Sequence, residues 1–384
     1  MGVAPADPLP AEAHRAYLTR ARFGALDGLR ALAIGAVLVH HSALARPEGP
    51  WSRGFLGVDL FFVISGFLIT ALLLRELEGA GRISLRGFYW RRALRILPLY
   101  YLLVTLVGAY FVFWHGPGEL ARLWPAYYLF LANFLSDHIP TLYPTWSLSM
   151  EEQFYLVWPL VMILLPRRLW GAALAVAILL NLLAVTGALA GLGVVAVEIG
   201  PFRVAMNDAT YAPLLLGSGL ALLLQDPRGF ALLWRGLSHP AMPLLLGVGL
   251  LAGLFWVLPL VLAGLPYLLV HLGMTALVAS LVLQEQSWLH GLLRWAPLAR
   301  IGAVSYGIYL LHLIVLHGVT LLAVRFGWAA TGPLFLFLYW GGTYLLAELS
   351  FRYYEGPFLR LRHAGPGGGA CGQYSSDRKD LRSQ

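Results

Sequence analysis

Arg30 and His41 are the two residues whose types and spacing most directly indicate chemistry in this 384-residue sequence. They lie eleven positions apart in the first long apolar stretch, LDGLRALAIGAVLVHHSALA. Eleven residues at about 100° each return an α-helix to within about 20° of its starting face, about 16 Å further along the axis. The two side chains therefore point the same way, with Asp27 one turn before Arg30 as its expected neutralising partner. An ionisable pair on one face of a membrane helix is costly to bury and indicates a functional site.

Asp59 is a second ionisable residue in an apolar stretch, GFLGVDLFFVISGFLIT. In an antiparallel hairpin with its loop centred near residue 50, Asp59 and His41 fall at the same depth. A carboxylate there would hold the tautomer of the histidine and stabilise its imidazolium during catalysis. The alternative is an ion pair that only fixes two helices together.

A cluster of arginines follows in YWRRALRILP, at Arg91, Arg92 and Arg95. We expect it at the same membrane face as Arg30. Four guanidiniums around one entrance suit a polyanionic cytosolic ligand, because arginine pairs with phosphate through two hydrogen bonds. The alternative, for Arg91 and Arg92 especially, is contact with the phosphates of membrane lipids.

Glu151 lies in the segment TWSLSMEEQFYLVWP, where Ser149 and Glu152 match a capping box. The capping box explains Glu152 but not Glu151, which we expect near the outer membrane face at about the depth of His41. Glu151 could transfer a proton or bind an acceptor hydroxyl, or it could be an interfacial carboxylate in water. Further on, His312 is interpreted as a core histidine, one helical turn after Tyr309.

The composition predicts the elements that position these residues. The chain is 59% hydrophobic and 12% charged, which is typical of a polytopic membrane protein. Its only lysine and its scattered arginines do not form a nucleic-acid-binding surface. A single cysteine, Cys371, excludes a disulfide framework, and the histidine spacings predict no metal site.

The expected fold is an all-α bundle of about ten transmembrane helices with both termini in the cytoplasm. The predicted spans are 28–46, 55–74, 94–114, 146–165, 170–193, 211–224, 240–258, 262–284, 301–323 and 331–350. This topology places most of the 27 Lys and Arg residues on the cytoplasmic side. Only five fall outside, namely Arg46, Arg53, Arg122, Arg203 and Arg325.

Three domain segments follow from this topology: a cytoplasmic segment 1–23, a membrane domain 24–362, and a polar tail 363–384 that we expect to be disordered. Residues 82–92 are predicted as an interfacial amphipathic helix. Residues 120–135 are apolar but short and interrupted by a proline, so we interpret them as re-entrant or interfacial on the outer side.

These segments together resemble the acyltransferase 3 family of integral membrane acyltransferases. The similar pieces are LDGLRALAIGAVLVHH, GVDLFFVISGFLIT, FYWRRALRILPLY, WSLSMEEQFYLVWP, IGAVSYGIYLLH and YYEGPF, in family order over about residues 24–360. The resemblance implies ten membrane helices in a multi-pass protein of the bacterial inner membrane. The chain resembles the stand-alone type, without the C-terminal SGNH domain of many relatives.

The resemblance also implies an activity, which is transfer of an acyl group, most simply acetyl, from acyl-CoA to a hydroxyl of a carbohydrate or small molecule. By position, Arg30 and His41 match the essential pair of the family, Asp59 its second-helix acid, and Glu151 the acid after Trp-Ser-Leu-Ser. No metal is implied. The rival interpretation is a proton-coupled transporter or flippase, since buried His, Asp and Arg also build proton relays. The absence of a visible inverted repeat speaks against it.

Overall fold

The computed structural model describes residues 10–42, 49–116, 119–186, 188, 196–205, 210–258, 262 and 264–362. The predicted polar tail 363–384 and the start of the predicted segment 1–23 lie outside these residues.

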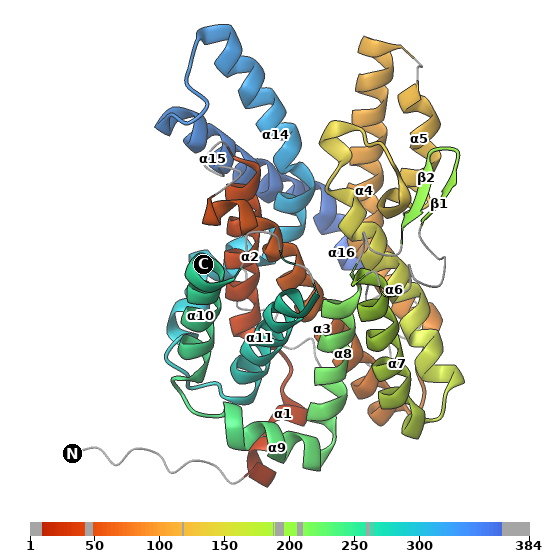
Figure 1. Cartoon of the computed structure of the whole chain (residues 1–384), viewed down its shortest axis with the longest axis vertical. Coiled ribbons are helices and arrows are strands. Elements are labelled where there is room, and N and C mark those ends of the chain that lie inside the picture. Colours follow the sequence, from red (N-terminus) through yellow and green to blue (C-terminus); the bar gives the residue numbers. More distant parts are fainter. Residues whose placement is uncertain are drawn as a thin grey trace, which may run out of the picture.

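Each of the ten predicted spans corresponds to a helix in the structure (Figure 1). These helices are α2 (Gly24–His41), α3 (Leu56–Ala80), α4 (Leu85–His115), α6 (Thr145–Leu164), α7 (Arg167–Val185), α8 (Ala212–Gln225), α10 (Met242–Ala252), α11 (Gly264–Leu283), α14 (Ser305–Phe326) and α15 (Pro333–Leu349).

Shorter elements connect them. The helical ones are α1 (Pro10–Thr19), η1 (Pro50–Phe55), α5 (Glu119–Tyr128), η2 (Ala132–Phe134), η3 (Pro140–Leu142), α9 (Pro227–Leu237), η5 (Gly253–Val257), α12 (His290–Leu293), α13 (Ala296–Ala303), η6 (Ser350–Glu355) and α16 (Gly356–Leu361). The strands β1 (Ala196–Ile199) and β2 (Phe202–Ala205) pair antiparallel, with Ala196 opposite Ala205.

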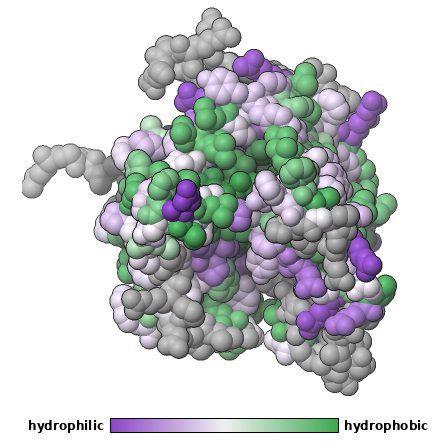
Figure 2. Space-filling view, turned by 90° about the horizontal axis from the view of Figure 1, so that it is seen from above, coloured by the Kyte–Doolittle hydropathy of each residue, from purple (hydrophilic) through white to green (hydrophobic). Residues whose placement is uncertain are grey.

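Among the described residues, six helices are long and apolar enough to cross a membrane, and two bent helix pairs raise the number to eight. The bent pairs are α1 with α2, at 73°, and α9 with the helix that begins at Met242, at 71°. The space-filling view shows hydrophobic residues over much of the visible surface (Figure 2). The chain is therefore an all-α membrane protein, while the count of ten spans and the side of the termini stay predictions.

Two local predictions differ from the structure. Residues 82–92 do not form a separate interfacial helix, because α4 runs without a break from Leu85 and its start is capped by Ser84, whose Oγ accepts a hydrogen bond from the Gly87 N–H. The capping box is also wrong, because α6 begins at Thr145, before Ser149. The segment 120–135 is a different case. Its helices, the ten-residue α5 and the three-residue η2, are each too short to cross a bilayer, as we expect for a segment that does not span the membrane.

Helix α3 lies at the centre of the bundle and contacts α8 backbone to backbone. A Cβ atom added at Gly66 of α3 would lie 2.0 Å from the Leu214 carbonyl oxygen, and one at Gly217 of α8 would lie 2.1 Å from that of Val63. Small residues allow such close approach in membrane bundles. The close contact with α8 fixes the position of α3, other residues of which line the cavities described below.

Candidate active site

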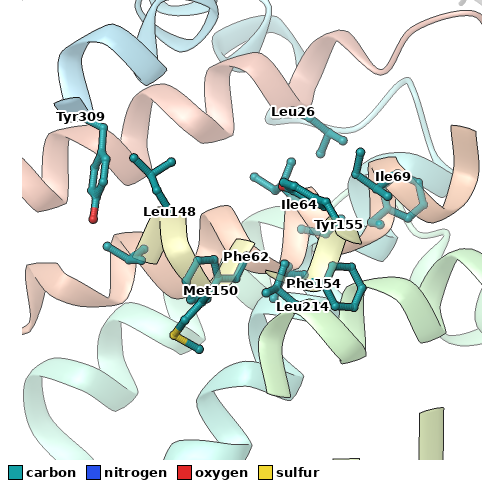
Figure 3. Packing of buried hydrophobic residues seen from close by; sticks show 14 of the residues in the cluster. Leu26, Phe62, Ile64, Ile69, Leu148, Met150, Phe154, Tyr155, Leu214 and Tyr309 are labelled. Carbon is teal, nitrogen blue, oxygen red and sulfur yellow. The ribbon is translucent and has the colours of Figure 1, made fainter. Parts of the chain in front are cut away.

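A polar cavity of about 170 Å³ lies inside the bundle and collects several of the predicted site residues. Helices α2, α3, α4, α6 and α14 contribute its walls. Its chemically active lining residues are Arg30, Arg92, Arg95, Ser147, Glu151, Tyr155, Tyr306 and Tyr309. Figure 3 shows Tyr309 and Leu148 at one side of this region, and Tyr155 with Ile64 and Ile69 at the other.

A second cavity of about 340 Å³ adjoins the first, since Arg30, Leu68, Leu72, Arg95 and Tyr306 line both. It adds three arginines that the sequence analysis did not single out, Arg22, Arg75 and Arg362. Asp27 and Glu355 are the acidic residues of its lining. The only sequence signal for these arginines was their place at predicted cytoplasmic helix ends, where positive charge is ordinary. We call the two adjoining cavities the arginine cavity.

The arginines of this cavity have different partners. Arg30 pairs with Asp27 at 3.2 Å, as predicted, and Arg22 approaches the same carboxylate at 2.6 Å. The Arg92 guanidinium lies 3.8 Å from the centre of the Tyr155 ring, a cation–π contact. Arg95 has neither an ion pair nor a hydrogen bond within the described part of the chain and is exposed to the cavity. Its charge is therefore available to an anionic ligand.

Arg91 lies apart from this group. It forms an ion pair with Glu76 of α3 at 3.0 Å and lines neither part of the arginine cavity. Glu76 also accepts a hydrogen bond from the Ser84 N–H, so it fixes the corner between α3 and α4. The predicted group of four arginines is thus divided, with Arg30, Arg92 and Arg95 together and Arg91 outside.

Glu151 lies in the arginine cavity, not beside His41. It accepts a hydrogen bond of 3.1 Å from the Tyr155 hydroxyl, one turn along α6. The cause is the earlier start of α6, in which Ser149 is already helical and its Oγ accepts a hydrogen bond from the Ala132 N–H. In this position the Glu151 carboxylate faces the guanidiniums across the cavity and balances part of their charge.

His41 lies at the end of α2 and contacts a second histidine. Its Nδ1 is 3.0 Å from the Val37 carbonyl oxygen. Its ring centre is 4.8 Å from that of His312 in α14, and His40 packs on it at the same distance. His312 was interpreted from sequence as a core histidine, and only the fold reveals that it meets His41.

Asp59 does not orient His41, and the predicted pair is wrong. Its Oδ2 accepts a 2.8 Å hydrogen bond from the Tyr267 hydroxyl and lies 3.3 Å from Nε2 of His271, both in α11. Asp59 and His271 are 3% and 1% exposed. These three residues form a buried link between α3 and α11, which we call the Asp59 cluster.

The register of α2 against α3 explains this error. A Cβ at Gly54 would meet the Ala36 carbonyl oxygen at 2.1 Å, and one at Gly57 would meet that of Ala33 at 2.2 Å. Continuing that register by two residues places Asp59 level with about residue 31. His41 is then about ten residues, or about 15 Å, further along the axis. The connection through η1 is not the symmetric loop around residue 50 that the prediction assumed.

One end of the inner cavity is formed by Ser147 and Tyr309. At its end the Tyr309 hydroxyl lies 2.7 Å from Ser147 Oγ and donates to the Pro144 carbonyl at 2.9 Å. The backbone carbonyl of Tyr309 lies 2.6 Å from Nδ1 of His312. Tyr309 is the lining residue nearest to the histidines, its ring centre being 5.7 Å from that of His312, and neither His41 nor His312 lines the cavity. Among the described residues no group of three or more His, Cys, Asp or Glu side chains could hold a metal ion.

Comparison with known proteins adds evidence of a different kind. Residues 23–349 match the family described as the acyltransferase domain. The peptidoglycan O-acetyltransferase OatA of Listeria monocytogenes is 31% identical over 361 residues, which cover 87% of this chain and 55% of that protein. The putative peptidoglycan O-acetyltransferase YrhL of Bacillus subtilis is 30% identical over 315 residues, covering 75% and 47%.

Putative O-acetyltransferases of Staphylococcus aureus are 35% identical over a shorter stretch of 153 residues. The chain spans about half the length of the first two relatives. No solved structure matches.

Proposed function

The chain belongs to the acyltransferase domain family, and we propose that it is a membrane O-acyltransferase that transfers an acyl group, most simply acetyl, from acyl-CoA to a hydroxyl. The observation that carries this proposal is the arginine cavity, which is lined by guanidiniums and ends at Tyr309, whose ring neighbours His312 and, beyond it, His41. Such a route suits a long donor with phosphates at one end and a thioester at the other.

The proposed donor path has two ends with different tasks. The phosphates of acyl-CoA bind at Arg30, Arg95 and the neighbouring arginines, where charge-assisted hydrogen bonds to phosphate are strong. The extended pantetheine arm crosses the about 16 Å of helix between Arg30 and His41. Arg92, held on Tyr155, and the Glu151 carboxylate shape the middle of the path.

At the far end His41 acts on the acceptor. Its neutral ring takes the hydroxyl proton as the acceptor oxygen attacks the thioester carbonyl, and the C–S bond then breaks. General base catalysis of this kind contributes about 10²–10⁴-fold to a rate. The half-buried position of His41 is useful, because partial exclusion of water limits hydrolysis of the thioester.

The names of the relatives suggest which class of acceptor to propose. Two of them carry names that refer to peptidoglycan, so we propose a carbohydrate hydroxyl of a cell-wall glycan first and a small-molecule hydroxyl second. We further propose ten spans with both termini cytoplasmic, residues 24–362 as the membrane domain, and a place in the bacterial inner membrane. Membership of the acyltransferase family gives no support to the proton-coupled transporter.

The test uses purified protein in nanodiscs with labelled acetyl-CoA and a soluble glycan or muropeptide acceptor. The wild type is expected to move the label to the acceptor in step with release of free CoA thiol. The His41→Ala variant is expected to bind acetyl-CoA without transfer, while His317→Ala, an exposed histidine of α14, serves as the matched control. Proton-driven substrate flux without consumption of thioester would contradict the proposal.

A further inference from the structure

Two hydroxyl groups lie together at one end of the inner cavity. Ser147 of α6 and Tyr309 of α14 both line this cavity, and their oxygen atoms are 2.7 Å apart. The two residues are 3% and 8% exposed. Figure 3 shows Tyr309 beside Leu148, on the side of this region that lies opposite Tyr155. Two hydrogen-bond donors therefore lie side by side in the cavity wall.

The packing of α6 on α3 places these hydroxyls far from the other end of the arginine cavity. The ring of Trp146, the residue before Ser147, has its centre 6.3 Å from that of Phe62 in α3. Arg75 of α3 lines the second cavity thirteen residues after Phe62, which is about 20 Å along the helix axis. An extended donor whose phosphates bind among the arginines can therefore place its thioester at the two hydroxyls.

The carbonyl oxygen of Pro144 has more hydrogen-bond donors than it needs. The backbone nitrogen of Ser147 lies 3.3 Å from it, the hydroxyl of Ser147 3.0 Å and the hydroxyl of Tyr309 2.9 Å. A carbonyl oxygen has two lone pairs, so two of these three donors satisfy it. The Tyr309 hydrogen can therefore turn into the cavity while both donors of Ser147 stay on Pro144. If the Ser147 hydroxyl donates to the Tyr309 oxygen instead, it strengthens Tyr309 as a donor.

We propose that Tyr309 is a catalytic residue that donates a hydrogen bond to the carbonyl oxygen of the thioester, with Ser147 as its positioning residue. This inference rests on the proposed function. As the acceptor oxygen bonds to the acyl carbon, His41 takes its proton and the C=O electron pair moves onto the carbonyl oxygen. The Tyr309 O–H keeps its hydrogen and stabilises this oxyanion. The C=O bond then re-forms, the C–S bond breaks, and the thiolate of CoA takes the proton from His41.

The proposed hydrogen bond is stronger in the transition state than with the bound substrate. The carbonyl oxygen of a thioester carries a partial negative charge, whereas the oxyanion carries a full one. A donor fixed in a nearly buried wall therefore lowers the barrier more than it tightens binding of the donor substrate. Its loss is expected to appear in kcat and not in KM.

Two conservative substitutions separate the roles of the hydroxyls. Tyr309→Phe keeps the ring and removes the donor, and kcat is expected to fall by about 10²–10³-fold, the range for removal of one oxyanion donor. The KM for acetyl-CoA is expected to stay close to that of the wild type, because the arginines are untouched. Ser147→Ala leaves the Tyr309 hydroxyl in place and is expected to lower kcat by less than about tenfold, the size of one neutral hydrogen bond.

Tyr339→Phe is the matched control. Tyr339 of α15 is also a buried tyrosine and lines neither part of the arginine cavity, and its hydroxyl has no hydrogen-bond partner among the described residues. Its kcat is expected to equal that of the wild type. A wild-type kcat in Tyr309→Phe, or a larger loss in Ser147→Ala than in Tyr309→Phe, would overturn the assignment of Tyr309.

A second measurement does not depend on acyl transfer. The His41→Ala variant in nanodiscs holds acetyl-CoA unreacted, and infrared difference spectra with and without carbon-13 in the acetyl carbonyl isolate the thioester C=O band. A hydrogen bond from Tyr309 weakens the C=O bond. The band is therefore expected at a lower wavenumber than in the double variant that also carries Tyr309→Phe. Equal band positions in the two proteins would overturn the inference.

The two measurements distinguish this inference from the proposed function. If the wild type transfers no acyl group but Tyr309→Phe shifts the band, the proposed function fails, and Tyr309 contacts the donor without a catalytic role. If the wild type and Tyr309→Phe transfer the acyl group with the same kcat, the proposed function stands and the role of Tyr309 fails. Absence of acetyl-CoA binding would overturn both.

Discussion

The His41–His312 pair and the Asp59 cluster both contain a fully buried histidine, His312 in the first and His271 in the second, yet the surroundings of the two sites differ. In the Asp59 cluster, one carboxylate oxygen lies within reach of both the Tyr267 hydroxyl and the His271 ring. In the histidine pair no carboxylate takes part, and this is what separates the sites, because within the described residues Nε2 of His312 and Nε2 of His271 are both buried without a hydrogen-bond partner. The first site holds a carboxylate beside its histidine, whereas the second holds only neighbouring imidazole rings.

The difference shows that burial of an ionisable group does not by itself identify catalysis. A buried carboxylate with its donors in place mainly holds helices together, since breaking such a group leaves an uncompensated charge. A buried base with a free lone pair can accept a proton from a substrate. We therefore interpret the Asp59 cluster as a link between α3 and α11, and His41 as the reacting group.

The largest expected effect concerns His41, the proposed base. His41→Ala removes the proposed base, so kcat for acyl transfer is expected to fall by about 10³-fold. Binding of acetyl-CoA, measured by isothermal titration in nanodiscs, is expected to stay within about twofold, because the arginine cavity is untouched. A wild-type kcat in the His41→Ala variant would show that His41 is not the reacting base.

The next effect is on stability and concerns the Asp59 cluster. Asp59→Ala leaves the buried His271 and Tyr267 without their acceptor, and breaking a buried pair in this way costs about 3–5 kcal/mol. Thermal unfolding of the detergent-solubilised protein is expected to show a clear fall in Tm. The double variant Asp59→Leu with His271→Leu removes both ionisable groups and is expected to regain much of that loss.

The same double variant separates structure from chemistry. If Asp59 only links α3 to α11, the folded double variant is expected to retain most of the wild-type kcat. A kcat as low as that of His41→Ala in a variant with recovered Tm would place Asp59 in the reaction instead.

The sequence predicted much of the fold because helix formation and membrane burial are local properties. Each long apolar stretch became a helix, and the pairing of Arg30 with Asp27 followed from one helical turn. The meeting of His41 with His312 could not be predicted, since 271 positions separate them and no local pattern indicates which helices touch. The error at Asp59 had a related cause, because the geometry of the connection through η1 sets the register of α2 on α3.

A smaller effect is expected in the arginine cavity, where we propose that the phosphates of the donor bind. Arg30→Gln keeps a polar side chain that can donate a hydrogen bond but removes a charge from the arginine cavity, and the KM for acyl-CoA is expected to rise by about tenfold, equivalent to about 1.4 kcal/mol. The kcat at saturating donor is expected to change by less than about threefold. Steady-state kinetics with varied acetyl-CoA measures both values.

Arg91→Gln is the matched control for this variant, because Arg91 pairs with Glu76 and lines neither part of the cavity. Its KM is expected to equal that of the wild type. A rise in KM as large as that of Arg30→Gln would place the donor phosphates outside the cavity that we propose.

The smallest effect is expected for Tyr267→Phe, which removes one donor from Asp59 and leaves His271 in place. Hydrogen bonds between membrane helices contribute about 0.6 kcal/mol on average, because alternative partners exist in the unfolded state within the membrane. A small fall in Tm with unchanged kcat is therefore expected from parallel unfolding and transfer assays. An effect as large as that of Asp59→Ala would mean that the Tyr267 hydroxyl, and not His271, is the main partner of the Asp59 carboxylate. The Asp59 cluster would then depend on one hydrogen bond between α3 and α11 and not on the contact between Asp59 and His271.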